Sequence, residues 1–249
     1  MIRALIIALF VASALGLLFA TGCSSIERKM LFYPSHDPDE SGLAPWTRGG
    51  VVIGCSREVD SPRNVWLMLH GNAGQASSRV YAIPSFSERD SVFILEYPGY
   101  GSRKGAPSRG ALDRAAKEAY LALREAYPTR PVCVAAESIG SGPAGYLAGL
   151  SQPPDKFVLI VPFDRLSLVA REHFPALLVR LLLRDDWNNL AAFSKYTGPV
   201  DIFGAQADAI IPVAHARALA ASIRSSRFIL IEGGHNEWSH AGRVQIRNP

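Results

Sequence analysis

Three residues that together could perform nucleophilic chemistry stand in separate short motifs of this 249-residue chain. Ser138 comes two residues before a glycine, Asp208 four residues before a proline, and His235 directly after a pair of glycines. A serine hydroxyl is a weak nucleophile until an imidazole takes its proton and a carboxylate holds that imidazole. We therefore treat these three residues as the candidate catalytic residues.

The surroundings of Ser138 match a nucleophile turn. The serine follows an apolar run, Pro131–Ala135, and precedes a helical stretch, Pro143–Leu150. A serine on a sharp strand-to-helix turn needs small neighbours two positions away on each side, which Ala136 and Gly140 provide. The pattern is A-x-S-x-G, with alanine where glycine is commoner. Taken alone, the motif also fits a Gly/Ser turn that only caps a helix.

A glycine-rich segment, His70-Gly71-Asn72-Ala73-Gly74, follows the apolar run Val65–Leu69. In this place such a loop supplies one backbone N–H to an oxyanion hole, and the residue after the nucleophile supplies the second. We expect the donors to be the amides of Asn72, with Ala73 as the alternative, and of Ile139. Ile139 opens a helix, whose unpaired N–H groups favour negative charge. The His70 side chain is expected to bond to nearby loop backbone.

Asp164 competes with Asp208 for the role of the acid. Both follow apolar runs, but Pro162-Phe163-Asp164 is more typical of a helix cap. Asp208 precedes a helix that Pro212 can start, so capping that helix is its alternative role. Asp208 is favoured as the acid.

Six histidines compete for the role of the base. His235 is favoured because its loop can reach back across the strand ends, and His240 on the same loop is the alternative. His173 and His215 lie on expected helices and are interpreted as packed or solvated. The resulting chain order of serine, acid and histidine is that of the α/β-hydrolase fold and not of other serine-protease folds.

The elements that must position these residues alternate along the chain. Continuous apolar runs indicate strands that are covered on both faces. The runs are Val51–Cys55, Val65–Leu69, Val92–Glu96, Pro131–Ala135, Phe157–Val161, Val200–Phe203 and Phe228–Ile231. Helical patterns such as Ala111–Tyr127 and Pro212–Ser225 lie between them. The alternation predicts a doubly wound, mostly parallel α/β sheet, which binds ligands beyond the carboxyl ends of its strands.

A small helical insert lies between Asp164 and Phe193, which in the strand numbering of the α/β-hydrolase fold is after the sixth strand. It contains six bulky apolar residues: Leu177, Leu178, Val179, Leu181, Leu182 and Leu183. One interpretation is an apolar cap over the site, which would favour a substrate with an acyl chain. The other is an ordinary buried helix.

The first 23 residues differ from the rest of the chain. Arg3 precedes an uninterrupted apolar run, Ala4–Ala20, and small residues follow up to Cys23. A charged start, an apolar middle and small residues at the end form an export signal. An ordinary cleaved signal and an uncleaved membrane anchor both fit this pattern. In either case the remainder, residues 24–249, is expected to be one α/β-hydrolase domain outside the cytoplasm.

Cys23 makes a more specific interpretation available. A cysteine directly after small residues resembles the lipobox of bacterial lipoproteins, which implies that Cys23 receives lipid and anchors the protein to a membrane of the cell envelope. Ser24 beside it resembles lipoproteins that are sorted to an outer membrane. Residues 1–23 are therefore expected to be a signal and lipoprotein anchor.

Composition excludes several other functions. The net charge of +4 is scattered along the chain, whereas nucleic-acid binding needs a basic patch or stripe. No Cys/His spacing suggests a metal site, and no cofactor is implied. Cys55 and Cys133 remain for disulfide chemistry, which an exported location permits but which nothing in their spacing supports.

Several of these motifs together resemble the Bem46-like α/β hydrolases, which are related to serine aminopeptidase-type hydrolases. The likeness covers roughly residues 30–240 and is carried by His70–Gly74, Glu96–Ser102, Glu137–Gly142 and Gly233–Asn236. In that family the Asp of a Gly-x-x-x-Asp-x-x-x-Pro stretch is the acid, which implies Asp208 here. The family is related to serine peptidase and esterase groups and includes protein depalmitoylases.

The expected function is that of a serine hydrolase that cleaves a carboxylic ester or thioester through an acyl-enzyme. Its substrate would be a small molecule or an acylated molecule. A peptidase or amidase on the same three residues is one alternative. A non-catalytic envelope lipoprotein that uses the fold as a binding module is the other.

Overall fold

A computed structural model describes residues 27–246. Cys23 and the predicted anchor lie outside these described residues. The core element is an eight-stranded sheet of order β1-β2-β4-β3-β5-β6-β7-β8. Its strands are β1 (Ala44–Arg48), β2 (Val51–Arg57), β3 (Val65–Leu69), β4 (Ser91–Leu95), β5 (Val132–Glu137), β6 (Phe157–Ile160), β7 (Val200–Ala205) and β8 (Ser226–Ile231).

The strands from β3 onward run parallel to one another, and only β1 and β2 are antiparallel to their neighbours. Every residue of β3, β4, β5, β6 and β7 is buried. This burial on both faces explains why these strands read as continuous apolar runs in the sequence. The predicted doubly wound, mostly parallel sheet is confirmed, with one additional edge strand, β1.

Helices and short 3₁₀ segments connect the strands. They are η1 (Ser77–Ser85), α2 (Arg109–Ala126), η2 (Ser138–Gly140), α3 (Ser141–Ala148), α4 (Leu166–His173), α5 (Ala176–Leu182), α6 (Asn189–Phe193), α7 (Val213–Ser222) and η3 (His240–Gly242). A further helical turn spans residues 27–31. No helix within residues 27–246 has the length and apolar character needed to cross a membrane.

α2 illustrates how the sequence sets a helix and its buried face. Ser108 caps the first turn, where its hydroxyl accepts a hydrogen bond from the Ala111 N–H at 3.2 Å. Leu112, Ala119 and Leu123 are buried along one side at helical spacing. This side packs against the sheet. α2 is the helix that connects β4 to β5.

Two apolar layers enclose the sheet. One layer contains buried side chains of α2, α3, α6 and α7. The other contains Phe86 and residues of η1, together with Trp238, Val244 and Ile246 near the end of the described chain. η3 lies near this second face, and Ile246 pairs with Phe86 through an isolated β-bridge.

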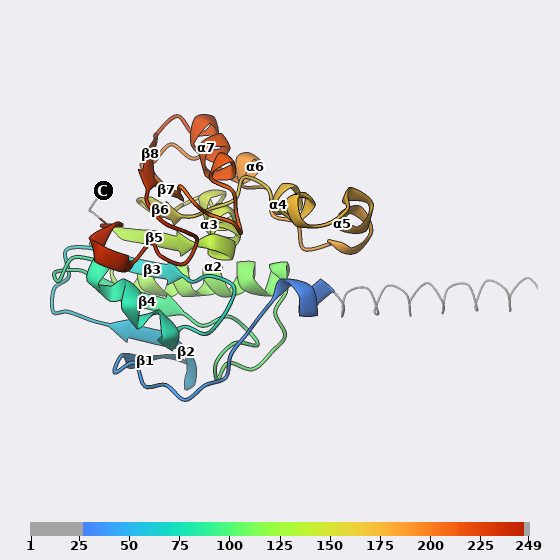
Figure 1. Ribbon diagram of the computed structural model, residues 1–249. Coiled ribbons are helices and arrows are strands. Elements are labelled where there is room, and N and C mark those ends of the chain that lie inside the picture. The colour runs from blue at the N-terminus through green and yellow to red at the C-terminus, as the bar shows by residue number, and fades with distance from the viewer. Residues whose placement is uncertain (1–26, 247–249) are drawn as a thin grey trace, which may run out of the picture.

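The three helices α4, α5 and α6 form the insert that follows β6. α6 packs against α3 near the sheet, whereas α4 and α5 project from the body of the protein (Figure 1). The helical turn at residues 27–31 lies at this same end of the molecule (Figure 1). The predicted helical insert after the sixth strand is confirmed.

Candidate active site

Ser138 sits at the turn between β5 and η2, at the carboxyl end of the parallel strands. Its backbone φ is 52°, in the left-handed region that residues other than glycine rarely adopt. This conformation costs on the order of 1–3 kcal/mol and persists only where the surroundings hold it. Ser141 at the start of α3 donates its hydroxyl to the Ser138 carbonyl oxygen at 2.7 Å. The strained turn presents the Ser138 side chain to a pocket.

His235 reaches Ser138 from the loop after β8. Gly233, with a φ of 89°, supplies a left-handed turn that a side chain would strain. The His235 Nε2 atom lies 2.9 Å from Ser138 Oγ, and its Nδ1 atom lies 2.7 Å from Asp208 Oδ2. These distances suit an Nδ1–H that donates to the carboxylate and a serine hydroxyl that donates to Nε2. All three side chains are buried.

Asp208 divides its two carboxylate oxygens between two tasks. Oδ2 faces His235, while Oδ1 accepts hydrogen bonds from the N–H groups of Ile210 at 2.9 Å and Ile211 at 2.7 Å. The second set fixes the turn that leads into α7. The alternative role of Asp208 as the cap of this helix is wrong, because the N-cap of α7 is Pro212 and no side chain caps that helix.

Asp164 pairs with a different histidine. Its Oδ1 atom lies 2.7 Å from His215 Nδ1, and both side chains are buried. The expectation that Asp164 caps a helix is wrong: the N-cap of α4 is Arg165, and no side chain caps that helix. The Asp164 carboxylate is turned toward His215 on α7 instead. The pair joins the insert to α7 and takes no part in the Ser138 contacts.

The other histidines take the positions expected of them. His70 is fully buried, and its Nδ1 atom lies 2.7 Å from the Gly71 carbonyl oxygen, a bond to loop backbone. His173 is exposed on α4 and bonds the Ile210 carbonyl oxygen. His240 lines the same pocket as Ser138, but it is His235 that bonds both the serine and the carboxylate.

Asn72 and Ile139, the expected backbone donors, both border the pocket beside Ser138, as does Ala73. The Asn72 side chain has a separate structural role. Its Nδ2 donates to the Leu31 carbonyl oxygen at 2.5 Å, and its Oδ1 accepts from the Tyr33 N–H at 3.2 Å. It therefore fastens the N-terminal segment along the pocket wall.

A buried charged cluster borders the site on one side and is absent from the sequence predictions. Glu137 directly precedes Ser138, and its Oε2 lies 3.2 Å from Arg79 Nε on η1. Its oxygens also accept hydrogen bonds from the Gly71 N–H, the Trp238 Nε1–H and the Tyr81 hydroxyl. The cluster ties β5, η1 and the glycine-rich loop together behind the serine.

Electrostatics keep Glu137 ionised. Burial by itself raises the pKa of this carboxyl, but the charge of Arg79 and the hydrogen bonds from Trp238 and Gly71 outweigh burial, so the pKa lies below its ordinary value. An acidic residue at the end of an apolar strand was the available signal in the sequence. Its partner Arg79 had no such signal in the sequence.

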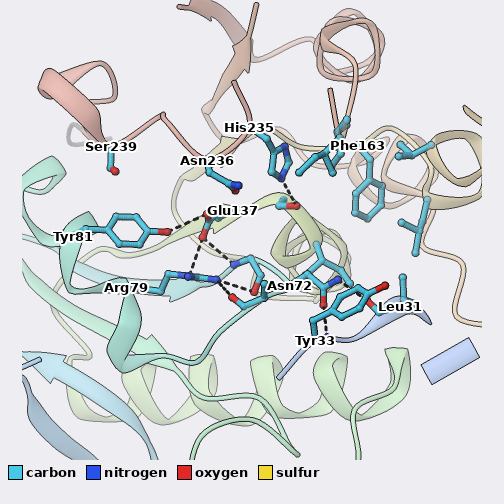
Figure 2. Close-up of a pocket in the computed structure, with 18 of the residues that line it drawn as sticks. Leu31, Tyr33, Asn72, Arg79, Tyr81, Glu137, Phe163, His235, Asn236 and Ser239 are labelled. Atoms are coloured by element: carbon cyan, nitrogen blue, oxygen red, sulfur yellow. Dashed lines mark hydrogen bonds and ion pairs between the residues drawn. The ribbon is translucent and has the colours of Figure 1, made fainter. Parts of the chain in front are cut away.

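The pocket around Ser138 has a volume of about 660 Å³ and two chemically different ends. Figure 2 shows Arg79, Tyr81 and Glu137 on one side of His235, and Phe163 and Leu31 on the other. Asn236 and Ser239 lie toward the Tyr81 side (Figure 2), and the lining also includes His240 and the apolar residues Leu166, Val169, Ile210 and Ile211. Such a pocket suits an amphiphilic molecule whose reacting carbonyl lies at the serine.

The insert contributes to this pocket through α4. Leu166 and Val169 of α4 line it, whereas none of the six bulky apolar residues singled out in the sequence does so. The interpretation of that stretch as an ordinary buried helix is also wrong, because only Val179 of α5 is buried. Leu177, Leu178 and Leu181 are exposed because α5 projects from the body of the protein (Figure 1).

Within residues 27–246, no group of three or more His, Cys, Asp or Glu side chains is arranged to hold a metal ion. Cys55 and Cys133 are buried and are not joined to each other. Burial, chiefly, raises the pKa of the Cys55 thiol to about 12, so it is protonated at neutral pH.

A largely parallel sheet that delivers a serine on a strained strand-to-helix turn is the architecture of the α/β-hydrolase class. Solved structures agree at the level of the fold. The esterase Pf2001 of Pyrococcus furiosus superposes with a TM-score of 0.62 at 13% identity, covering 84% of this chain and 91% of that one. Est816, an N-acyl homoserine lactone degrading enzyme, gives 0.59 at 14% identity, covering 80% and 95%.

Sequence comparison places the chain in a family. An uncharacterized protein of Mycobacterium tuberculosis is 30% identical over 86% of this chain and 82% of its own length. The human α/β hydrolase domain-containing protein 17B is 31% identical over 77% and 67%. The lysophosphatidylserine lipase ABHD12 of Danio rerio is 27% identical over 63% and 46%. No protein-family model matches the chain. The chain belongs to the α/β hydrolase family and is a hydrolase.

Proposed function

We propose that this protein is a serine hydrolase that cleaves carboxylic ester or thioester bonds through Ser138, His235 and Asp208. The observation that carries the proposal is the continuous hydrogen-bonded line from Ser138 Oγ through the His235 ring to Asp208 Oδ2, with separations of 2.9 and 2.7 Å. A lipase among the relatives and an esterase among the structural neighbours support the same type of chemistry.

In the first half of the reaction, Ser138 Oγ attacks the substrate carbonyl carbon while His235 Nε2 takes the hydroxyl proton. Asp208 stabilises the imidazolium that forms and holds the ring in the correct tautomer. The carbonyl oxygen gains negative charge and is met by the backbone N–H groups of Asn72 and Ile139. Collapse of the tetrahedral intermediate transfers the histidine proton to the leaving alcohol or thiol and leaves an acyl-serine.

The second half repeats these steps with water. His235 removes a proton from the water molecule as its oxygen attacks the acyl carbon. The same two amides stabilise the second oxyanion. When this intermediate collapses, the proton returns to Ser138 Oγ and the carboxylic acid leaves. No other group has to change its protonation state across the cycle.

The two ends of the pocket support a substrate with an acyl group. An acyl chain fits against Phe163, Leu166 and Val169, because burying its methylene groups there is favourable by about 0.8 kcal/mol for each CH₂. The leaving group would then lie toward Tyr81 and Asn236, which offer hydrogen-bonding groups. Short polar esters use only part of this surface, so we expect turnover to rise with acyl length.

The location of the enzyme belongs to the same proposal. We infer that residues 1–23 anchor the hydrolase domain to a membrane of the cell envelope, with Cys23 as the lipidated residue. The apolar run Ala4–Ala20 followed by small residues supports this. The motifs from His70 to Asn236 support membership of the Bem46-like subgroup.

A fluorophosphonate probe tests the central claim. Ser138 should displace fluoride from the probe and become covalently labelled, and the Ser138→Ala variant should not label. Turnover of a soluble 4-nitrophenyl ester should fall by about 10⁶-fold in that variant. Ser194→Ala is the matched control, because Ser194 is exposed at the end of α6 and should label and turn over like wild type.

The rival functions give different results in the same assay. A peptidase or amidase would label at Ser138 but hydrolyse a matched anilide faster than the ester. A non-catalytic binding protein would fold normally and show no labelling in wild type. Either result would overturn the proposal of an esterase or thioesterase.

A further inference from the structure

α5 and the residues just before it expose an apolar face that the rest of the described chain covers only in part. Leu177 is 66% exposed and Leu181 58% exposed, with Leu178 and Phe174 also exposed, whereas Val179 turns inward at 6%. Contiguous exposed apolar side chains of this kind mark a binding surface. We call Phe174, Leu177, Leu178 and Leu181 the α5 face.

Exposed cationic residues outnumber exposed acidic ones on the segments beside this face, where Glu172 is also exposed. Exposed cationic residues lie on the helical turn at 27–31, at the end of α4, and on or just after α5: they are Arg28, Lys29, Arg171, Arg180 and Arg184. Helices that bind at a membrane surface combine an apolar face with a basic margin. Each such cation is attracted to the anionic head groups of a bilayer.

The chain enters the described structure directly beside α5. Glu27 Oε1 accepts hydrogen bonds from the N–H groups of Arg184 at 2.5 Å and Asp185 at 2.7 Å. Met30 and Leu31 then form one wall of an apolar groove whose other wall includes Phe174 and Leu178. The N-terminal segment is therefore fastened to the insert.

This attachment limits how far the α5 face can be from the membrane. Four residue steps separate Cys23 from Glu27, and a fully extended chain covers at most about 14 Å over that length. Anchoring at residues 1–23 thus holds α5 close to the lipid head groups.

We propose that the α5 face is a membrane-docking surface that inserts into the interface of an anionic bilayer and turns the pocket toward the lipid. Leu31 borders both the apolar groove and the pocket, and α4 lines the pocket and precedes α5. Docking would therefore bring the apolar end of the pocket next to the bilayer. This inference rests on the proposed membrane anchor and adds a second contact that orients the domain.

A photocrosslinking experiment tests the contact in the full chain. The protein is reconstituted into phosphatidylcholine vesicles that contain phosphatidylglycerol, with p-benzoylphenylalanine in place of Leu177. The control carries p-benzoylphenylalanine in place of Leu121, an exposed leucine on α2. Leu121 lies twelve residues beyond Arg109, where α2 begins, and so about 18 Å along the helix from its start. We expect lipid adducts at position 177 and not at position 121.

A double variant tests the consequence for activity. Leu177→Asp/Leu181→Asp should lower turnover of vesicle-embedded 4-methylumbelliferyl palmitate about tenfold or more. Turnover of soluble 4-nitrophenyl butyrate should be unchanged, because neither leucine lines the pocket. Leu121→Asp should change neither rate.

Each outcome decides between the possibilities. Equal adducts at positions 177 and 121, failure of the chain to float with vesicles, or protein–protein adducts from a second copy at position 177 would each overturn docking. If the wild-type protein hydrolysed neither the soluble nor the vesicle-embedded ester, the proposed hydrolase function would be overturned. If it hydrolysed the soluble ester but formed no lipid adducts, docking alone would be overturned.

Discussion

The carbonyl oxygen of Leu69 lies 2.2 Å from the position that a Cβ atom on Gly140 would occupy. The Leu69 carbonyl carbon and the His70 carbonyl oxygen are within 2.9 Å of the same point. These are backbone atoms of β3 and its following loop, so they cannot rotate away as a side chain could. The turn at Ser138 therefore packs directly against the neighbouring strand, and glycine at position 140 is what allows this.

Gly140→Ala should abolish fluorophosphonate labelling and destabilise the fold by about 3 kcal/mol, because the added methyl forces β3 and the serine turn apart. Urea unfolding and the labelling rate measure the two effects. Ala136→Gly is the matched control at the other small position of the motif, and it should label normally while losing about 1 kcal/mol from a strand interior. Wild-type labelling in Gly140→Ala would contradict the packing of this turn.

Asp208→Asn should lower kcat for a soluble ester by about 10⁴-fold, because an amide no longer holds the His235 tautomer that accepts the serine proton. Asp164→Asn is the matched comparison, since it alters an aspartate that also follows a strand but pairs with His215. Its kcat should remain within the same order of magnitude as wild type. Steady-state kinetics measure both, and a larger loss in Asp164→Asn would reverse the assignment of the acid.

The sequence predicts most strands of this fold because burial on both faces leaves a continuous apolar run. The sequence did not predict β1, because this strand is not buried on both faces. It is an edge strand that pairs only with β2, and most of its residues are exposed. Pro45 and Arg48 lie at positions where no apolar side chain has to face a core. Its pairing depends on β2 and not on a pattern of its own.

The residues of the candidate site differ in the same way, because some stand in a local sequence pattern and others do not. Ser138, Asp208 and His235 each stand in a local turn motif, so their types and spacing indicate a role before any contact is known. Arg79 stands in η1, where nothing local distinguishes it from a surface arginine, and its pairing with Glu137 arises only when η1 packs against the sheet. Tertiary contacts of this kind leave no trace in a single sequence.

The outward position of the α5 leucines was equally hidden. A short leucine-rich stretch has the same composition whether it lies in the core, over a pocket or on the surface. The choice here is made by where α4 and α5 leave the body of the protein. Only the exposed fractions of Leu177 and Leu181 distinguish the three possibilities.

The Glu137–Arg79 pair makes the stability of the protein depend on pH. The pKa of Glu137 is lower in the folded state than its ordinary value of 4.5. The stabilisation is therefore fully present above about pH 4.5 and is lost as the pH falls through the folded-state pKa. Urea unfolding across this range should show wild type losing stability on acidification.

Glu137→Gln should remove much of that dependence. Near neutral pH it should lower the free energy of unfolding by about 3 kcal/mol, because Arg79 is left largely buried without its carboxylate. The gap from wild type should shrink on acidification, since protonated Glu137 and glutamine are both neutral. Glu237→Gln is the matched control: Glu237 pairs with Arg243 at the surface, so its loss should cost no more than about 1 kcal/mol. A gap for Glu137→Gln that stayed constant through the acid range would mean that this carboxyl is not held ionised by Arg79.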